Sequence, residues 1–298
     1  MGLPLLAFLQ FLRLRGFCRH DVGSAHSPVA GVMGDPVIHS ASPRIHGTWL
    51  QQTGIDGHYV RLPVRGVDLP AALAALPALG FRGVNLTLPH KEQALRLVDD
   101  IAGPAVAIGA LNVVTVGPDG RLTGHNTDVE GVLAPLAPFD LEDRPVCVLG
   151  AGGAARAVLA ALSARRVGEV RLINRSVVRG QALLEHFGHV GWVGDWATVA
   201  QGYRGAALII NASSLGMVGQ PPLPVEALQL AEAARDAVVF DIVYKPLETA
   251  LLTAARAQGL ATIDGLAMLL AQAAPAFKLF FGVAAPTDHA ALRAMLTA

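Results

Sequence analysis

The stretch VCVLGAGGAARAVLAALSARRVGEVRLIN, at residues 146–174, constrains the fold of this chain more than any other. An apolar run typical of a buried strand is followed by Gly150, Gly152 and Gly153, then by an alanine-rich helical segment and a second apolar run. This order of strand, tight turn, helix and strand defines a βαβ unit. Its two strands must be parallel, because the helix carries the chain back across the sheet. The sequence therefore predicts a parallel α/β sheet around this turn.

The same alternation of short apolar runs and alanine- or leucine-rich segments continues along the chain from about residue 30. Such alternation is typical of parallel sheets with helices on both faces. An Asp-Gly pair between two runs at 111–127 predicts a hairpin. The expected strands are 29–34, 57–64, 81–88, 111–127 (two), 146–150, 167–174, 206–213, 237–244 and 261–265. The expected helices are 42–54, with Ser42 as N-cap and Gly54 as stop, 70–80, 151–166, 225–236, 247–259 and 265–282.

A Pro- and Asp-rich stretch at 134–145 is typical of a loop between domains. We therefore expect a two-domain α/β protein: an N-terminal extension at 1–28, a substrate-binding domain at 29–132, a nucleotide-binding domain at 133–262 and C-terminal helices at 263–298. The last apolar helix has no strand after it.

Composition excludes several classes of protein. The 298 residues are 52% hydrophobic and 15% charged, which supports folded domains rather than disorder. The formal net charge of +0 argues against a nucleic-acid-binding protein. No uncharged stretch reads as a membrane span, because the longest carries several polar residues and prolines. Two cysteines give neither a disulfide framework nor a zinc site, so we expect no metal and a reducing, cytoplasmic location. Oligomeric state is left open as monomer or homodimer.

The glycine turn predicts a dinucleotide site of the Rossmann type. The first glycine allows a tight turn, and the second lets the backbone approach a pyrophosphate at the helix N-terminus. A plain turn without a ligand is the alternative. At the end of the next strand, an NAD site would have an acidic residue. This chain has Asn174, Arg175 and Arg179 instead, which favours the 2′-phosphate of NADP. Two solvated arginines at a helix start are the alternative.

Polar residues gather at the ends of the expected strands in the first domain. Hydroxyl, amide, ammonium and carboxylate groups at one edge of a sheet suit a small acid with several hydroxyls. A lysine can donate a proton to a developing alkoxide, and an aspartate can hold it in place, although a solvated loop lysine and a helix-capping aspartate are the alternatives. The residues concerned are Ser40, Ser42, Asn85, Thr87, Lys91, Asn112, Asn126, Thr127 and Asp128.

Gln272 lies in an otherwise apolar helix. A buried amide without hydrogen-bond partners costs roughly 1–3 kcal/mol, so this side chain needs a partner. Substrate hydroxyls are one possibility, and a backbone carbonyl is the other.

Nine motifs, in chain order, resemble those of the shikimate dehydrogenase family: GDPVIHSASPRIH, GVNLTLPHK, GALNVV, GHNTD, VLGAGGAAR, NRS, NASSLGM, DIVYKPLET and DGLAMLLAQAA. The resemblance runs from about residue 30 to the C-terminus. It implies a substrate domain, a Rossmann-type NADP domain and a C-terminal helix that returns to the first domain. It also implies reversible NADPH-dependent reduction of 3-dehydroshikimate to shikimate, in aromatic amino-acid biosynthesis.

The resemblance implies a role for each matching residue. Lys91 and Asp128 would be the catalytic pair, and both would also contact substrate. Ser40 and Ser42 would bind the substrate carboxylate, with Thr87, Asn112 and Gln272 around the ring. The cofactor would be NADP(H), held by Gly150, Ala151, Gly152, Gly153, Ala154, Asn174, Arg175, Arg179, Met217, Tyr244 and Gly265.

The chain also departs from the family pattern at Gly47, Val113, Val129 and Ala267. Val113 removes a hydroxyl beside Asn112, and Val129 adds bulk beside Asp128. These departures leave two alternatives open besides shikimate: a quinate/shikimate dehydrogenase with altered substrate or NAD preference, and a non-catalytic nucleotide-binding regulator.

Overall fold

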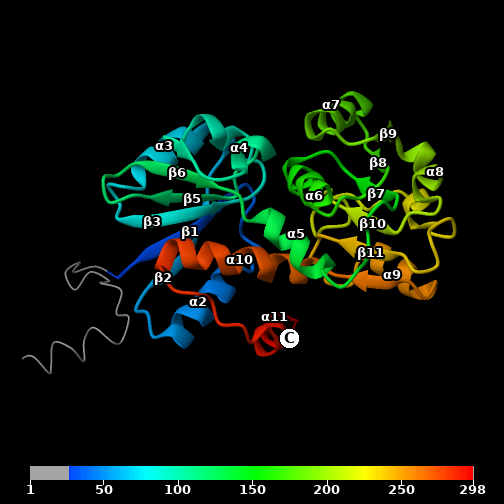
Figure 1. The fold of residues 1–298 in the computed structure, drawn as a ribbon. Coiled ribbons are helices and arrows are strands. Elements are labelled where there is room, and N and C mark those ends of the chain that lie inside the picture. The colour runs from blue at the N-terminus through cyan, green and yellow to red at the C-terminus, as the bar shows by residue number, and fades with distance from the viewer. Residues whose placement is uncertain (1–26, 298) are drawn as a thin grey trace, which may run out of the picture.

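The computed structural model describes residues 27–297, which form two α/β halves (Figure 1). The first half contains a six-stranded sheet in the order β2-β1-β3-β5-β6-β4. Strands β1, β2 and β3 are parallel, and β5 runs antiparallel to both β3 and β6. Of the predicted extension at 1–28, only residues 27 and 28 are among the described residues. Cys18 lies outside them. The strands are β1 (Val29–Gly34), β2 (His58–Pro63), β3 (Phe81–Leu86), β4 (Asp100–Ile101), β5 (Val113–Val116) and β6 (Leu122–His125).

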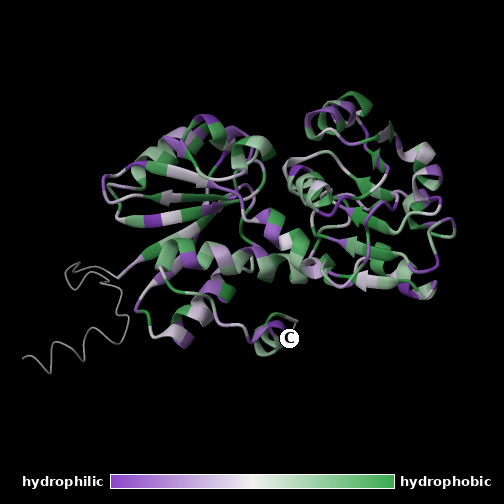
Figure 2. Ribbon diagram, viewed as in Figure 1, coloured by the Kyte–Doolittle hydropathy of each residue, from purple (hydrophilic) through white to green (hydrophobic). Residues whose placement is uncertain are grey.

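The second half is a fully parallel six-stranded sheet in the order β12-β11-β10-β7-β8-β9. In chain order this is 6-5-4-1-2-3, the arrangement of dinucleotide-binding sheets. Its central strands are mostly hydrophobic (Figure 2), as expected for a sheet covered on both faces. They are β7 (Val146–Leu149), β8 (Val170–Ile173), β9 (Gly191–Gly194), β10 (Leu208–Asn211), β11 (Val238–Asp241) and β12 (Ala261–Ile263).

Helices cover both faces of each sheet. In the first half, α2 (Ser42–Thr53) and α10 (Gly265–Phe281) build one core, and α3 (Leu69–Ala75) and α4 (Ala105–Ile108) build the other. In the second half, one core contains α5 (Asp128–Leu136), α6 (Gly153–Ala164) and α7 (Val177–Phe187). The opposite core contains α8 (Val199–Tyr203) and α9 (Ala250–Ala257). The last helix is α11 (His289–Thr297), which contacts α2.

Helix α10 returns from the second half to the first, as predicted (Figure 1). It begins at Gly265, where the Asp264 side chain accepts a hydrogen bond from the Ala267 N–H. Leu270, Ala273 and Phe277 pack into the first-half core with Trp49. The two halves are therefore joined through α5 and α10, which cross each other closely.

Three local predictions are wrong. Helix α2 has Ala41 as N-cap rather than Ser42, although Gly54 ends the helix in the left-handed conformation as expected. Residues 134–136, predicted as loop, complete α5. The domain boundary at 132/133, which lies within this helix, stays a prediction.

The third wrong prediction is a helix at 225–236. The structure has only a 3₁₀ turn at Val225–Leu228. The Ala234 N–H donates to the Ala206 carbonyl, and the Glu232 carbonyl accepts from the Gly205 N–H. These long-range bonds replace the ladder that a helix would need, so tertiary contacts override helix propensity here.

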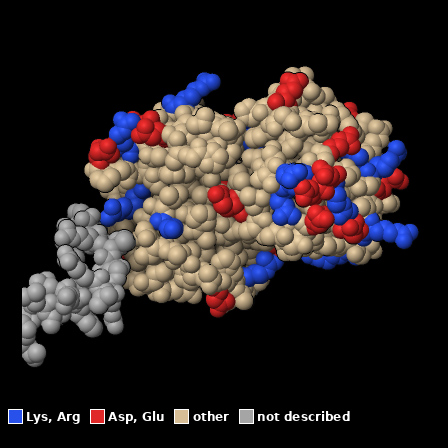
Figure 3. All heavy atoms as spheres, in the orientation of Figure 1, with Lys and Arg blue, Asp and Glu red and all other residues tan. Residues whose placement is uncertain are grey.

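Charged side chains of both signs are mixed on the visible surface (Figure 3), with no large patch of one sign. No helix within residues 27–297 has the length and hydropathy that a bilayer crossing requires. The described residues hold no group of His, Cys, Asp or Glu arranged to bind a metal ion.

Candidate active site

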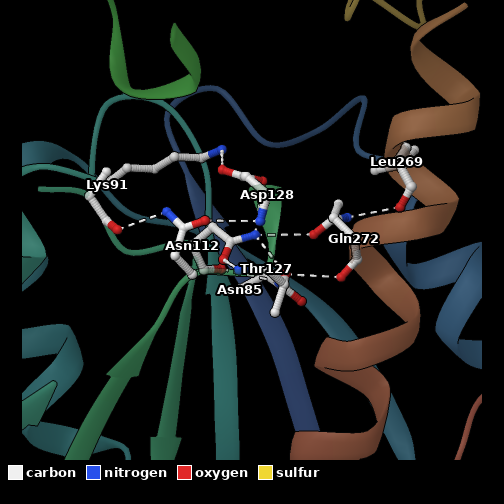
Figure 4. A network of polar contacts seen from close by, with 9 residues as sticks. Asn85, Lys91, Asn112, Thr127, Asp128, Leu269 and Gln272 are labelled. Carbon is white, nitrogen blue, oxygen red and sulfur yellow. Dashed lines mark hydrogen bonds and ion pairs between the residues drawn. The ribbon is translucent and has the colours of Figure 1, made fainter. Parts of the chain in front are cut away.

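A buried polar cluster lies where the ends of the first sheet meet α5 and α10 (Figure 4). Lys91 follows β3 after a short loop, Asn112 immediately precedes β5, and Asp128 is the first residue of α5. Gln272 comes from α10, more than a hundred residues further along the chain. Apart from Lys91, which is partly accessible, these side chains are almost fully buried. The fold thus brings together four residues that the sequence predicted as one site.

Lys91 and Asp128 form an ion pair, with 2.6 Å between Nζ and Oδ2. The side chains are 17% and 4% exposed, so solvent screens the pair only weakly. Asp128 lies at the N-terminus of α5, where the helix dipole stabilises a carboxylate. Among the described residues Asp128 is the one acceptor for this ammonium, which leaves two of its three protons for another acceptor.

Asn112 is the centre of the cluster. Its amide nitrogen donates to Thr127 Oγ1 and Asp128 Oδ1, both at 2.9 Å, and to Gln272 Oε1 at 3.2 Å. Two N–H groups serve three acceptors, so one bond is shared. Its amide oxygen accepts from the Thr127 N–H at 2.7 Å. Asn112 therefore fixes the Asp128 carboxylate by direct contact.

Gln272 uses the backbone carbonyl, one of the two partners that the sequence left open, and also contacts Asn112. Its amide nitrogen donates to the Leu269 carbonyl at 3.0 Å, which is the backbone alternative. Its amide oxygen accepts from Asn112 within the polar cluster. The Gln272 carbonyl also accepts from Thr127 Oγ1 at 2.9 Å. The side chain is thus already satisfied in this structure, while its amide lies at the edge of the site.

Two residues behind the cluster hold it in place. Tyr59 donates its hydroxyl proton to Asn85 Oδ1 at 2.7 Å, and Asn85 Nδ2 donates to the Asn112 carbonyl at 3.1 Å. Burial raises the pKa of the Tyr59 hydroxyl, an effect partly offset by a hydrogen bond with Ser42. Tyr59 was not predicted from the sequence. Its one signal was a tyrosine in a strand of otherwise alternating character, which is too common to be informative.

Ser40 and Ser42 lie at the start of α2. Ser40 Oγ accepts from the Ser42 N–H at 3.3 Å, and Ser42 is buried. Neither hydroxyl bonds directly to Lys91 or Asp128. Thr87, at the end of β3, is half-buried and pairs through its backbone N–H with the Met33 carbonyl. Only Ser42 is linked to the cluster, indirectly, because it lies beside Tyr59, which donates to Asn85.

The glycine turn has the geometry that a pyrophosphate needs. Gly150 has φ +104°, and a Cβ there would lie 2.9 Å from the Ser213 Cβ. A Cβ at Gly152 would meet nothing within 4 Å, which leaves the start of α6 open to a ligand. A Cβ at Gly153 would lie 3.4 Å from the Lys91 Cβ. Ala151 lies between Gly150 and Gly152, and Ala154 follows Gly153. Because Gly153 lies against Lys91, the turn adjoins the polar cluster. Because the backbone at Gly152 is open, the turn fits a dinucleotide.

The predicted adenosine-phosphate residues lie beside this turn. Asn174 donates to the Ser176 carbonyl, and Ser176 caps α7 by accepting from the Arg179 N–H. Arg179 donates from Nε to the Ala151 carbonyl at 2.6 Å. Arg175 is exposed and forms no ion pair within residues 27–297. Two guanidinium groups thus lie near the carboxyl end of β8, and that of Arg179 also donates to Glu92 at 2.6 Å.

Of the remaining predicted cofactor residues, Met217 and Tyr244 lie in loops of the second half and Gly265 begins α10. The loop of Met217 lies beside the loop of Tyr244, because the Val218 N–H donates to the Lys245 carbonyl at 2.8 Å. Tyr244 packs against the first-half core, where burial raises its pKa and a hydrogen bond with Ser40 partly offsets the effect. A Cβ at Gly265 would lie 2.3 Å from the Ile242 carbonyl oxygen, so only glycine fits there.

The departures from the family pattern lie at different distances from the cluster. Val113 is fully buried in β5, directly after Asn112. Val129 packs against the core formed by α5 and α6, and Ala267 against the same core. Gly47 lies in α2, where a Cβ would meet nothing within 4 Å.

The sequence of this chain matches known protein families and individual proteins over most of its length. Three family models match: "Shikimate dehydrogenase substrate binding domain" at residues 32–114, "Shikimate / quinate 5-dehydrogenase" at 133–243 and "Shikimate 5'-dehydrogenase C-terminal domain" at 265–290. The chain is 48% identical over 274 residues to the shikimate dehydrogenase (NADP(+)) of Sphingopyxis alaskensis, covering 91% of this chain and 98% of that protein. It is 50% identical over 278 residues to that of Rhodospirillum rubrum, covering 90% and 96%.

A solved structure agrees with these matches. Shikimate 5-dehydrogenase from Thermus thermophilus, in complex with NADP(H) and shikimate, has a TM-score of 0.79 and 37% sequence identity. The match covers 91% of this chain and 100% of that one. The predicted fold class, two α/β domains with a Rossmann-type second domain, is therefore confirmed.

Proposed function

The chain belongs to the shikimate dehydrogenase family, and from that premise we propose that it reduces 3-dehydroshikimate reversibly to shikimate with NADPH. One observation carries the proposal: the buried Lys91–Asp128 ion pair lies against the glycine turn that would hold the cofactor. A proton donor and a hydride donor would thus lie side by side.

Lys91 would act as the general acid. When bound, NADPH supplies the hydride that reduces the substrate carbonyl carbon. The Lys91 ammonium then donates a proton to the oxygen as negative charge develops on it, and takes the proton back in the reverse reaction. Asp128 orients the ammonium at 2.6 Å, and Asn112 fixes the other carboxylate oxygen at 2.9 Å.

The other polar residues would hold the substrate. Ser40 and Ser42 would bind its carboxylate through their hydroxyls, and Tyr244 beside Ser40 would help to close this end. Thr87, Asn112 and Gln272 would contact the ring hydroxyls. The Gln272 amide nitrogen donates one N–H to Leu269 and has a second N–H, which would be the donor to a substrate hydroxyl.

NADP(H) would be held along the carboxyl edge of the second sheet. The backbone of residues 150–154 would take the pyrophosphate at the start of α6. Asn174, Arg175 and Arg179 would contact the adenosine 2′-phosphate, since guanidinium groups bind phosphate in a two-pronged geometry. Met217, Tyr244 and Gly265 would line the nicotinamide end. A cytoplasmic location, and a state of monomer or homodimer, remain predictions.

The proposal is tested by measuring kcat/KM of the purified protein with shikimate and quinate, each against NADP⁺ and NAD⁺. We expect the highest value for shikimate with NADP⁺. A preference for quinate would make Val113 and Val129 the first positions to revert. NADP⁺ binding without turnover of either acid would contradict the proposal and favour a nucleotide-binding regulator.

Lys91→Ala should lower kcat by roughly 10²- to 10⁴-fold, because general acid–base catalysis contributes a factor of this size. The measurement is steady-state turnover at saturating shikimate and NADP⁺. Lys278→Ala is the matched control, since Lys278 is an exposed lysine on α10. Near-normal turnover of Lys91→Ala would show that another group moves the proton.

A further inference from the structure

Glu92, the residue after Lys91, connects the two halves of the molecule. Its Oε1 accepts from the Arg179 guanidinium at 2.6 Å, and its Oε2 lies 3.8 Å from Arg156 Nε. Arg179 belongs to α7 and Arg156 to α6, whereas Glu92 belongs to the first half. The carboxylate thus bridges two arginines across the space between the sheets.

Arg179 is held in a fixed orientation. Its Nε donates to the Ala151 carbonyl in the glycine turn, so the guanidinium is held beside the proposed cofactor site. One terminal nitrogen donates to Glu92. A carboxylate and a phosphate compete for the same guanidinium donors, because both accept two parallel N–H bonds.

We propose that Glu92 occupies Arg179 in the absence of cofactor and that the 2′-phosphate of NADP takes its place, which makes Glu92 a specificity-determining residue. This inference rests on the proposed role of Arg179 in cofactor binding. The phosphate dianion and the carboxylate repel each other, so the arrival of one releases the other. NAD carries a neutral 2′-hydroxyl and leaves the Glu92–Arg179 pair intact.

The surroundings of Glu92 give the released carboxylate a place to go. Arg156 remains within reach, and a cavity of about 590 Å³ opens on this side, lined by Glu92, Arg96, Gly109 and Arg156 among others. Other contacts between the halves lie nearby: Arg156 donates to the Ile108 carbonyl and His186 to the Ala107 carbonyl. Exchange at Arg179 therefore removes one contact of a larger set and need not separate the halves.

The first test is Glu92→Gln, which keeps the shape of the side chain and removes its charge. The Kd for NADP⁺ should fall about two- to fivefold, the size expected for a partly exposed ion pair, while the Kd for NAD⁺ changes less. Titration calorimetry at low ionic strength measures both. The gain should shrink near 1 M salt, where the Debye length is about 3 Å. An unchanged or weaker NADP⁺ affinity would overturn the inference.

Two controls separate this inference from the proposed cofactor site. Glu142→Gln removes an exposed carboxylate paired with Arg166 at 3.1 Å, before β7 and away from the glycine turn, and should alter neither Kd. Arg179→Ala should weaken NADP⁺ more than NAD⁺; if it does not, the proposed site is wrong. In the double variant Arg179→Ala/Glu92→Gln, the gain from Glu92→Gln should disappear. A gain that persists would mean simple repulsion of the phosphate and would overturn the exchange.

Discussion

His46 lies fully inside the first-half core, with its ring stacked on Tyr59 at a centroid distance of 4.0 Å and an angle of 5°. Neither ring nitrogen has a hydrogen-bond partner within residues 27–297. Burial without a partner lowers the pKa of His46 to about 3. The ring is therefore neutral at physiological pH. It packs against Tyr59, which donates a hydrogen bond to Asn85 next to the candidate active site. A single titratable residue thus links the core to the site.

His46 should make the folded protein less stable in mild acid. Its folded pKa of about 3 lies below the ordinary value of 6.5, so protonation below pH 6.5 favours the unfolded chain. The stability that the neutral His46 ring contributes to the folded protein is fully present above pH 6.5. As the pH falls from 6.5 toward 3, this stability decreases by up to about 1.4 kcal/mol per pH unit. Urea unfolding of His46→Phe should show a shallower pH dependence than the parent. The exposed His39→Gln is the control, and equal slopes for the parent and His46→Phe would contradict the assignment.

Helices α5 and α10 build the site because they approach each other closely. Gly131 faces α10, where a Cβ would lie 2.9 Å from the Gln272 Cβ and 3.1 Å from the Met268 carbonyl oxygen. This approach allows Thr127 to reach the Gln272 carbonyl. Asp128 at the start of α5 and Gln272 on α10 both contact Asn112. Their positions therefore depend on Gly131, the small residue between the two helices.

Gly131→Ala and Gly47→Ala form a matched pair of helix substitutions. Alanine is favoured over glycine in a helix by about 1 kcal/mol, so Gly47→Ala, with open space around it, should stabilise the protein. Gly131→Ala should instead destabilise it by about 1–3 kcal/mol, because the new methyl forces the helices apart. It should also raise the KM for shikimate by moving Gln272. Denaturant unfolding and steady-state kinetics measure these effects, and two stabilising substitutions would show that the crossing can relax.

At the scale of the whole molecule, the first half is completed by a helix that lies at the end of the chain. Phe277 of α10 is fully buried. Its ring centroid lies 5.5 Å from that of Trp49, in an edge-on arrangement, and 4.9 Å from that of Phe281. The proposed substrate residues of the first half thus depend on packing supplied by a helix that follows the second sheet in the chain. We therefore expect the folding of the two halves to be coupled.

Phe277→Ala should lower the stability of the first half by about 3–5 kcal/mol, because it leaves a cavity in the core. Trp49 reports on this half, whereas the other two tryptophans of the chain, Trp192 and Trp196, lie in the second half. With those two replaced by Phe, fluorescence during denaturant unfolding follows Trp49 alone. Leu279→Ala, an exposed position on the same helix, is the control. Core truncations of this kind usually cost about 3–5 kcal/mol. A decrease in unfolding free energy below about 1 kcal/mol for Phe277→Ala would therefore mean that the first-half core does not need α10.

Local pattern was enough to predict much of this protein. The strand, glycine turn and helix around Gly150 follow from backbone geometry and periodicity, which act over a few residues. The polar residues at strand ends were found because parallel strands of one sheet end at a common edge. The chemistry available to Lys91 and Asp128 also follows from their side-chain types. Their roles in catalysis and binding remain predictions.

Tertiary structure decided what depends on distance along the chain. Asn112 and Gln272 are 160 residues apart, and Glu92 and Arg179 are 87 apart. The segment 225–236 has helical spacing, yet its backbone bonds to Gly205 and Ala206. The sequence by itself determined which groups exist and which local conformations they favour, because those preferences arise within one turn or strand. Only the packed fold decided which groups meet, because a contact depends on the free energy of the whole arrangement.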